Sequence, residues 1–219
     1  DIETKNVKLK NLATSIISYD KNGADIVALQ EVENLNILNQ LFDLLEPYGY
    51  QDVMLIEGKD YRGIDTAIIS KYKILEAKLH YITFSGKFEG KDTRPILDAI
   101  IDVNGSKVKI YNVHFPSGFH DVSMRIDSLN LLSELLENHN YPTIALGDFN
   151  VNTKEDIELD IYKSQEKYWS VAHLEGCEDC KGSYYYNYGR AWEYLDTIFL
   201  SKNRGINYVP DSINIHVTP

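Results

Sequence analysis

Four short apolar segments of the chain each run into an acidic or histidine side chain, and this pattern limits the fold more than any other feature. The polar residues are Glu31 after residues 26–29, His114 after 108–113, Asp148 after 144–146 and Asp196 within 195–199. Apolar runs of this length indicate strands that are buried in a sheet. Because ligand sites of α/β proteins lie beyond strand ends, we expect these side chains to converge.

Helices and strands are mixed along the 219 residues, without a linker or an internal repeat. Apolar spacing and an acidic segment predict helices at 7–19, 34–46, 121–138 and 154–166. Runs rich in Ile, Val, Tyr and Thr predict strands at 25–30, 50–56, 64–70, 73–84, 96–103, 107–113, 142–147, 183–188, 194–200 and 212–217. Asn34 is a predicted helix N-cap, and Asn104-Gly105 predicts a hairpin turn. We therefore expect one α/β domain over residues 1–219, with mixed sheets.

The chain is acidic, with 22 basic and 33 acidic residues and a formal net charge of −11. Proteins that coat nucleic acids non-specifically have a basic surface, which this composition does not favour. Chemistry on a phosphate would need another source of positive charge, and a divalent metal ion is the obvious one. No segment approaches roughly 18 consecutive apolar residues, so we expect no transmembrane segment.

The residue types at the strand ends suit metal-assisted attack of water on a phosphate ester. Glu31 offers a hard oxygen ligand for Mg²⁺, and Asp148 can bind the same ion or accept a proton. His114 and Asn112 can donate hydrogen bonds to charge that develops on phosphorus, and Asn150 can hold Asp148 in place. Each residue taken alone has a simpler reading, as a helix cap, a structural histidine or a turn. The interpretation as a phosphoesterase site depends on all of these residues occurring together, in this order along the chain.

Six segments in a fixed order resemble the endonuclease/exonuclease/phosphatase family. They are ADIVALQEVEN (24–34), RGIDTAIISKYKI (62–74), RPILDAIIDVNG (94–105), YNVHFPSG (111–118), ALGDFN (145–150) and WEYLDTIFLS (192–201). The resemblance covers most of the chain. It implies the fold of deoxyribonuclease I, a four-layer α/β sandwich in which two mixed β-sheets pack face to face with helices outside. It also implies Mg²⁺ or Mn²⁺ as cofactor.

The resemblance assigns catalytic roles to four of these residues. Glu31 would be the main metal ligand, and Asp148 would bind the metal and position or deprotonate the attacking water. Asn150 would bind the phosphate and steady Asp148. His114 would stabilise the pentacovalent transition state.

Further roles follow from the same resemblance. Asp196 would orient a catalytic histidine near the C-terminus, Asn112 and Arg94 would contact the substrate, and Asp65 would support His114. The family pattern opens with a strand that carries an Asn metal ligand and closes with Ser-Asp-His-x-Pro. Neither motif occurs in residues 1–219, so we expect a domain that lacks its terminal strands, and His216 is a weak substitute for the last histidine.

Two local features leave several interpretations open. Cys177 and Cys180 form a single CxxC, which is compatible with inert thiols, a local disulfide or, least readily, a metal site. The tyrosines of 184–188 either alternate between core and solvent along a strand or stack on a base or sugar.

We expect a divalent-metal-dependent phosphoesterase, acting as an endonuclease or phosphodiesterase, with a phosphate ester as its partner, DNA and RNA included. The alternatives are a phosphatase or phosphodiesterase for small molecules or lipids, and a binding protein that has lost catalysis. We expect a monomer.

Overall fold

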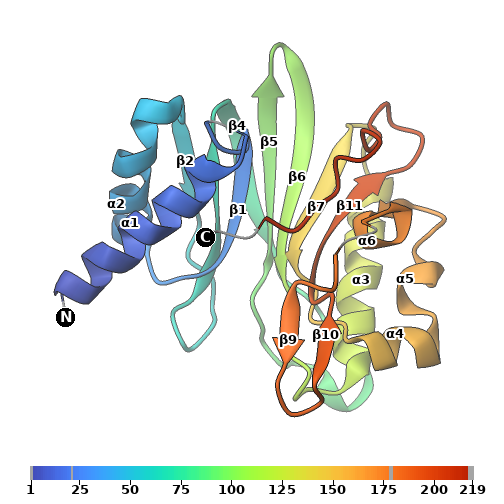
Figure 1. The fold of residues 1–219 in the computed structure, drawn as a ribbon. Helices are drawn as coiled ribbons and strands as arrows, with labels where there is room; N and C mark the ends of the chain where they lie inside the picture. Colours follow the sequence, from blue (N-terminus) through green and yellow to red (C-terminus); the bar gives the residue numbers. More distant parts are fainter. Residues whose placement is uncertain (1, 21, 178–179, 217–219) are drawn as a thin grey trace.

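The computed structural model describes residues 2–20, 22–177 and 180–216, in which the two main sheets lie against each other (Figure 1). The larger sheet has the strand order β4 (Lys73–His80), β5 (Ile96–Val103), β6 (Ser106–His114), β7 (Thr143–Asp148), β11 (Asp196–Ser201) and β8 (Trp169–Val171). The smaller sheet has the order β1 (Ile26–Val32), β3 (Asp65–Ser70) and β2 (Asp52–Leu55). The larger sheet is mixed, because β6 and β7 run parallel. The described pairs of the smaller sheet are antiparallel, which corrects the expectation of two mixed sheets.

Helices cover the outer faces of both sheets (Figure 1). The smaller sheet carries α1 (Ile2–Ser18) and α2 (Leu35–Leu45), and α2 is followed by the 3₁₀ turn η1 (Glu46–Tyr48). The larger sheet carries α3 (Val122–Glu137), with α4 (Thr153–Leu159), α5 (Ile161–Ser164) and α6 (Ala172–Glu175) beside it. The remaining elements are η2 (Gly86–Phe88) and the hairpin β9 (Tyr184–Tyr186) and β10 (Ala191–Glu193).

Three apolar clusters fill the spaces between these four layers. Strand β3 is buried on both faces, and its successive side chains point alternately to one face and the other, so that it contributes to two of these clusters. Its Ala67 and Ile69 pack toward α1 and α2, whereas Ile68 between them packs toward the larger sheet. A third cluster joins the larger sheet to α3, with Leu132 and Phe199 both fully buried.

Local sequence signals predict element ends well. The side chain of Asn34 accepts a hydrogen bond from the Ile37 amide at 3.0 Å, which confirms the N-cap of α2. Asn104 and Gly105 both have positive φ angles, +54° and +87°, and turn the chain from β5 into β6. The predicted helix at 121–138 is α3, and its N-cap Asp121 accepts from the Ser123 amide.

Three other predictions are corrected by the structure. Residues 212–216, predicted as a strand that continues into residue 217 outside the described part, form neither helix nor strand. Cys177 and Cys180 form a disulfide, so the inert-thiol interpretation is wrong. The tyrosines of β9 do not alternate between core and solvent, because Tyr184, Tyr185 and Tyr186 are all exposed.

The half-buried His173 is expected to make a pH-dependent contribution to stability. Its Nδ1 lies 2.9 Å from Thr197 Oγ1, its ring stacks on Tyr194, and burial lowers its pKa to about 4. An unfolded histidine titrates at about 6.5, so the unfolded chain takes up the proton first as the pH falls. This contribution is therefore complete above about pH 6.5 and is lost toward pH 4.

We expect the stability advantage of the wild type over His173→Gln, measured by urea unfolding, to shrink between pH 7 and pH 4.5. Comparing the two proteins at each pH cancels the titration of the other groups. An advantage that stays constant across this range contradicts the prediction.

Candidate active site

Backbone register brings three of the predicted residues together at one end of the larger sheet. His114 ends β6, Asp148 ends β7 and Asp196 begins β11. The register pairs His114 with Asp148 across the parallel strands, and Asp148 with Asp196 across the antiparallel strands. The three residues therefore lie in one row at the end of the sheet where β6 and β7 end and β11 begins.

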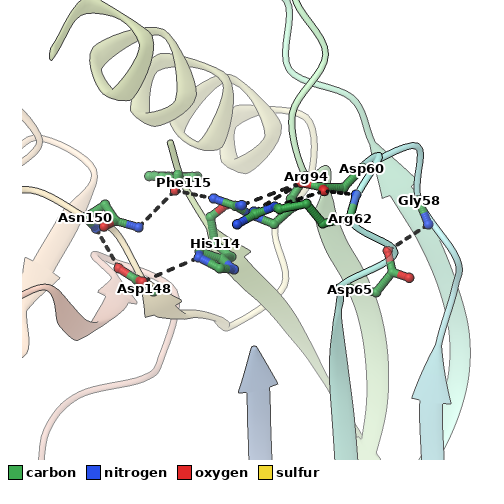
Figure 2. Close-up of polar contacts among 9 residues, drawn as sticks. All are labelled: Gly58, Asp60, Arg62, Asp65, Arg94, His114, Phe115, Asp148 and Asn150. Atoms are coloured by element: carbon green, nitrogen blue, oxygen red, sulfur yellow. Dashed lines mark hydrogen bonds and ion pairs between the residues drawn. The ribbon is translucent and has the colours of Figure 1, made fainter. Parts of the chain in front are cut away.

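The turn after β7 fixes the carboxylate of Asp148. The backbone N–H of Asn150 donates to Asp148 Oδ1 at 2.9 Å, and Asn150 itself has a φ of +54°. Its side-chain amide donates to the Phe115 carbonyl at 3.0 Å, which ties this turn to the end of β6 (Figure 2). Gly147 approaches the neighbouring strand so closely that a Cβ there would lie 2.2 Å from the Val113 carbonyl oxygen.

Glu31 reaches the site from the other sheet through a bulge. The pairing of β1 with β3 shifts register between Leu29 and Val32, and Glu31 has a φ of +59°. A bulge re-aims a side chain, and a positive φ on a residue other than glycine often marks a functional position. Glu31 consequently lines the same cavity as Asp148 and His114.

The cavity has a volume of about 480 Å³ and opens to solvent between the two sheets. Besides the predicted residues, its wall includes the loop between β2 and β3 and the loop that follows β6. The lining residues are Glu31, Lys59, Asp60, Tyr61, Arg62, Asp92, Thr93, Arg94, His114, Pro116, Ser117, His120, Asp148 and Asn150.

His114 is buried and uncharged at neutral pH. Its Nε2 lies 3.5 Å from Asp148 Oδ2, as Figure 2 shows. Burial, with a smaller contribution from the positive charge of Arg62, lowers its pKa to about 4. Among the described residues, its Nδ1 is the buried side-chain polar atom without a hydrogen-bond partner. A buried polar group left unpaired is unusual in a protein and is typical of functional sites.

Asp148 is the other strongly perturbed group. Burial raises its pKa to about 7, and the negative charges of Asp196 and Glu31 add to the increase. These carboxylates thus repel one another, and a bound cation would relieve the repulsion. The described residues include no group of three or more His, Cys, Asp or Glu that could enclose a metal. Mg²⁺ needs no such cage, since one or two carboxylates with water and substrate phosphate oxygens suffice. Glu31 and Asp148 therefore fit a divalent ion.

Arg94 lies in the cavity wall, but most of its guanidinium is already bonded. Its Nε donates to the His114 carbonyl at 3.1 Å and its Nη2 donates to the Phe115 carbonyl at 2.9 Å (Figure 2). Its Nη1 lies 3.5 Å from Asp60. Arg94 therefore holds the end of β6 in place, and Nη1 is the group left to face a substrate.

Asn112 lies away from the cavity. It is fully buried, and its side-chain amide donates to the carbonyls of Leu29 and Ala67 in the smaller sheet. Its Oδ1 accepts from Gln30 Nε2 at 2.8 Å. The structure therefore gives Asn112 a place in the join between the sheets, and the geometry offers no support for the substrate contact expected of it.

The remaining candidates are placed as follows. Asp196 is exposed and lies beside Asp148. Asp65 accepts from the Gly58 amide at 2.8 Å rather than from His114 (Figure 2). His216 lies 2.8 Å from Ser18 Oγ, against the end of α1.

The loop between β2 and β3 is the part of the site that the sequence analysis missed. Lys59, Asp60 and Arg62 line the cavity, yet none ends a strand, and Arg62, the first residue of the segment 62–74, was assigned no role. Two cations around an acid in a segment with Gly58 and Gly63 were the available signal.

Comparisons with known proteins agree with this architecture. A D. rerio TDP2 humanized by 14 mutations has a TM-score of 0.68 at 20% identity, over 92% of this chain and 78% of that one. A β-hairpin deletion mutant of Staphylococcus aureus beta toxin has a TM-score of 0.69 at 20% identity, over 98% and 85%. A Bacteroides thetaiotaomicron mannosyl-6-phosphatase has a TM-score of 0.61 at 19% identity, over 91% and 78%.

No curated protein sequence matches the chain. At these identities the structural matches show the fold, which is the four-layer sandwich predicted for deoxyribonuclease I-like proteins. No helix in the described ranges is long and apolar enough to cross a membrane. Residues 2–205 match the profile of the Endonuclease/Exonuclease/phosphatase family. Because this match covers nearly the whole sequence, the chain belongs to the endonuclease/exonuclease/phosphatase family.

Proposed function

We propose that this protein hydrolyses phosphodiesters, such as those of DNA or RNA, with the help of a divalent metal ion, Mg²⁺ or Mn²⁺. The observation that carries the proposal is the convergence of Glu31, His114, Asp148 and Asn150 on one open cavity. The cavity is larger than a single phosphate group requires, which leaves room for the substituents on both sides of a diester.

Each residue has a chemical role in this reaction. The carboxylate of Asp148 lines the cavity and can accept a proton from the attacking water. Asn150 holds its carboxylate through the 2.9 Å hydrogen bond from the backbone. Neutral His114 donates a hydrogen bond to a phosphate oxygen as negative charge develops there. The water oxygen forms the new bond to phosphorus and the bond from phosphorus to the leaving oxygen breaks. That oxygen takes up a proton from solvent and leaves as an alcohol, and Asp148 releases its proton to solvent.

Glu31 and Asp148 would hold the metal ion, at the point where β1 and β7 end. When bound, a divalent ion supplies positive charge that stabilises the phosphate oxygens in the transition state. This charge matters in a protein whose formal net charge is −11, because the substrate is itself an anion.

The proposal is tested by incubating the protein with bis(p-nitrophenyl) phosphate, plasmid DNA and RNA, in Mg²⁺ or Mn²⁺ and in EDTA. We expect turnover with metal and none in EDTA. No metal-dependent turnover on any of the three would rule out the phosphodiesterase and favour a binding protein with this fold.

Replacing Glu31 with glutamine is expected to weaken metal binding at least about tenfold, because a charged ligand becomes neutral. Calorimetric titration with Mn²⁺ measures the change. Glu33→Gln is the matched control, since it removes the same charge two residues away at an exposed position. Equal affinities of Glu31→Gln and wild type would reject Glu31 as a ligand.

A further inference from the structure

One wall of the active-site cavity carries positive charge that the proposed chemistry does not use. Glu31 and Asp148 place negative charge near one end of the cavity, where the metal would bind. The loop between β2 and β3 contributes Lys59 and Arg62 to the wall, and Arg94 lies beside them. The described acids on this wall are Asp60 and Asp92, so cations outnumber acids locally, whereas acids are in excess in the whole chain.

A buried carboxylate sets the position of the two arginines. The side chain of Asp60 is 7% exposed and lies between Arg62 and Arg94. It accepts from Arg62 Nε at 3.2 Å and from Arg62 Nη2 at 3.3 Å, and it lies 3.5 Å from Arg94 Nη1. Figure 2 shows the two arginines close together, next to His114. One carboxylate thus holds two guanidinium groups, which leaves an uncompensated positive charge at this point.

Arg62 is the arginine available for a ligand. Arg94 is buried and bonded to two carbonyls, whereas the Arg62 side chain is 40% exposed. Among the described residues, hydrogen bonds from its side chain go to Asp60, and none engages its Nη1. Lys59 on the same loop also lines the cavity, and its Nζ lies over the ring of Tyr81, 4.9 Å from the centroid.

We propose that Arg62, assisted by Lys59, binds a second anionic group of the substrate, next to the phosphate that is cleaved. A planar guanidinium held in place by a carboxylate is suited to phosphate oxygens. The inference rests on the proposed phosphodiesterase or phosphatase chemistry and names the class of substrate, one with two neighbouring phosphates. Such a pair occurs both in a polynucleotide and in a small bisphosphate.

The test compares substrates with one and two anionic groups on the wild type, Arg62→Ala and Arg62→Lys. Thymidylyl-(3′→5′)-thymidine and a hexose monophosphate each have one anionic group. A single-stranded oligothymidylate and a hexose bisphosphate each have a neighbouring one, and they separate the two sources. We expect the oligothymidylate or the hexose bisphosphate to have at least a tenfold higher kcat/KM than its counterpart with one anionic group, which has the same leaving group.

In Arg62→Ala this preference is expected to fall at least tenfold, mainly through KM, and Arg62→Lys is expected to restore part of it. Lys154→Ala is the control, because Lys154 is an exposed cation on α4 that pairs with Glu158 outside the cavity. It should leave the preference as in the wild type. An equal loss on all substrates in Arg62→Ala, or a wild type without the preference, overturns the proposal.

A wild type that hydrolyses none of the substrates contradicts the phosphoesterase function, and the second anion site is then decided by binding. Calorimetry with the oligothymidylate and the hexose bisphosphate, in Ca²⁺ buffer, is compared between wild type and Arg62→Ala. At least tenfold weaker binding of one ligand by the variant supports the site. Equal affinities for both ligands reject it.

Discussion

Replacing Asp148 with asparagine is expected to lower kcat on bis(p-nitrophenyl) phosphate by about 10³-fold. The amide occupies nearly the same space and can keep the hydrogen bond from the Asn150 backbone, but it cannot accept the proton of the attacking water. It also removes one of the two carboxylates proposed to hold the metal. A loss of this size corresponds to about 4 kcal/mol of transition-state stabilisation.

The measurement is the initial rate in saturating Mg²⁺, with circular dichroism as the check on folding. Asp43→Asn is the matched control, because Asp43 is an exposed carboxylate on α2 and does not line the cavity. A rate for Asp148→Asn within tenfold of the wild type would show that another residue activates the water.

Replacing Arg125 with methionine is expected to destabilise the fold by about 3–5 kcal/mol. The Arg125 side chain is fully buried in α3 and pairs with Glu155 of α4. Its Nη1 also donates to the carbonyls of Pro116, Ser117 and His120, at 3.1, 2.8 and 3.3 Å. Methionine is of similar length but leaves these carbonyls and Glu155 without their donor, and a buried group without a partner is costly.

Urea unfolding measures this change. Lys154→Met serves as its control, because the Lys154–Glu158 pair is exposed and such pairs contribute at most about 1 kcal/mol. The loop that Arg125 holds lines the cavity, so catalytic activity is expected to fall along with stability. A destabilisation below about 1 kcal/mol would show that the buried pair contributes little.

The sequence predicts this fold well where the signals are local. The Asn34 cap, the Asn104-Gly105 turn and the apolar face of α3 each depend on residues that are close together in the chain. The segment 212–217 alternates apolar and polar residues like a strand, yet residues 212–216 pair with no strand in the structure. A strand needs a partner, and alternation does not specify one.

The site likewise contains residues that local sequence signals predict and residues that they do not. His114 and Asp148 are predictable because each ends an apolar strand, and their adjacency follows from the pairing of β6 with β7. The bulge at Glu31 and the loop that carries Arg62 are set by contacts between distant segments. The residues next to them in the sequence do not indicate those contacts. The sequence therefore predicts the reactive residues of the site better than the residues that form the rest of the cavity.

The join at Asn112 has a consequence for how the site keeps its shape. The proposed metal ligand Glu31 lies on one sheet and Asp148 on the other, so a small sliding of the sheets would change the distance between them. Asn112 bonds to Leu29 and Gln30, which directly precede Glu31 in the chain, and to Ala67 of the neighbouring strand β3. Asn112 therefore fixes the position of one sheet relative to the other, and with it the spacing of Glu31 and Asp148. It does so from outside the cavity, without contacting the substrate.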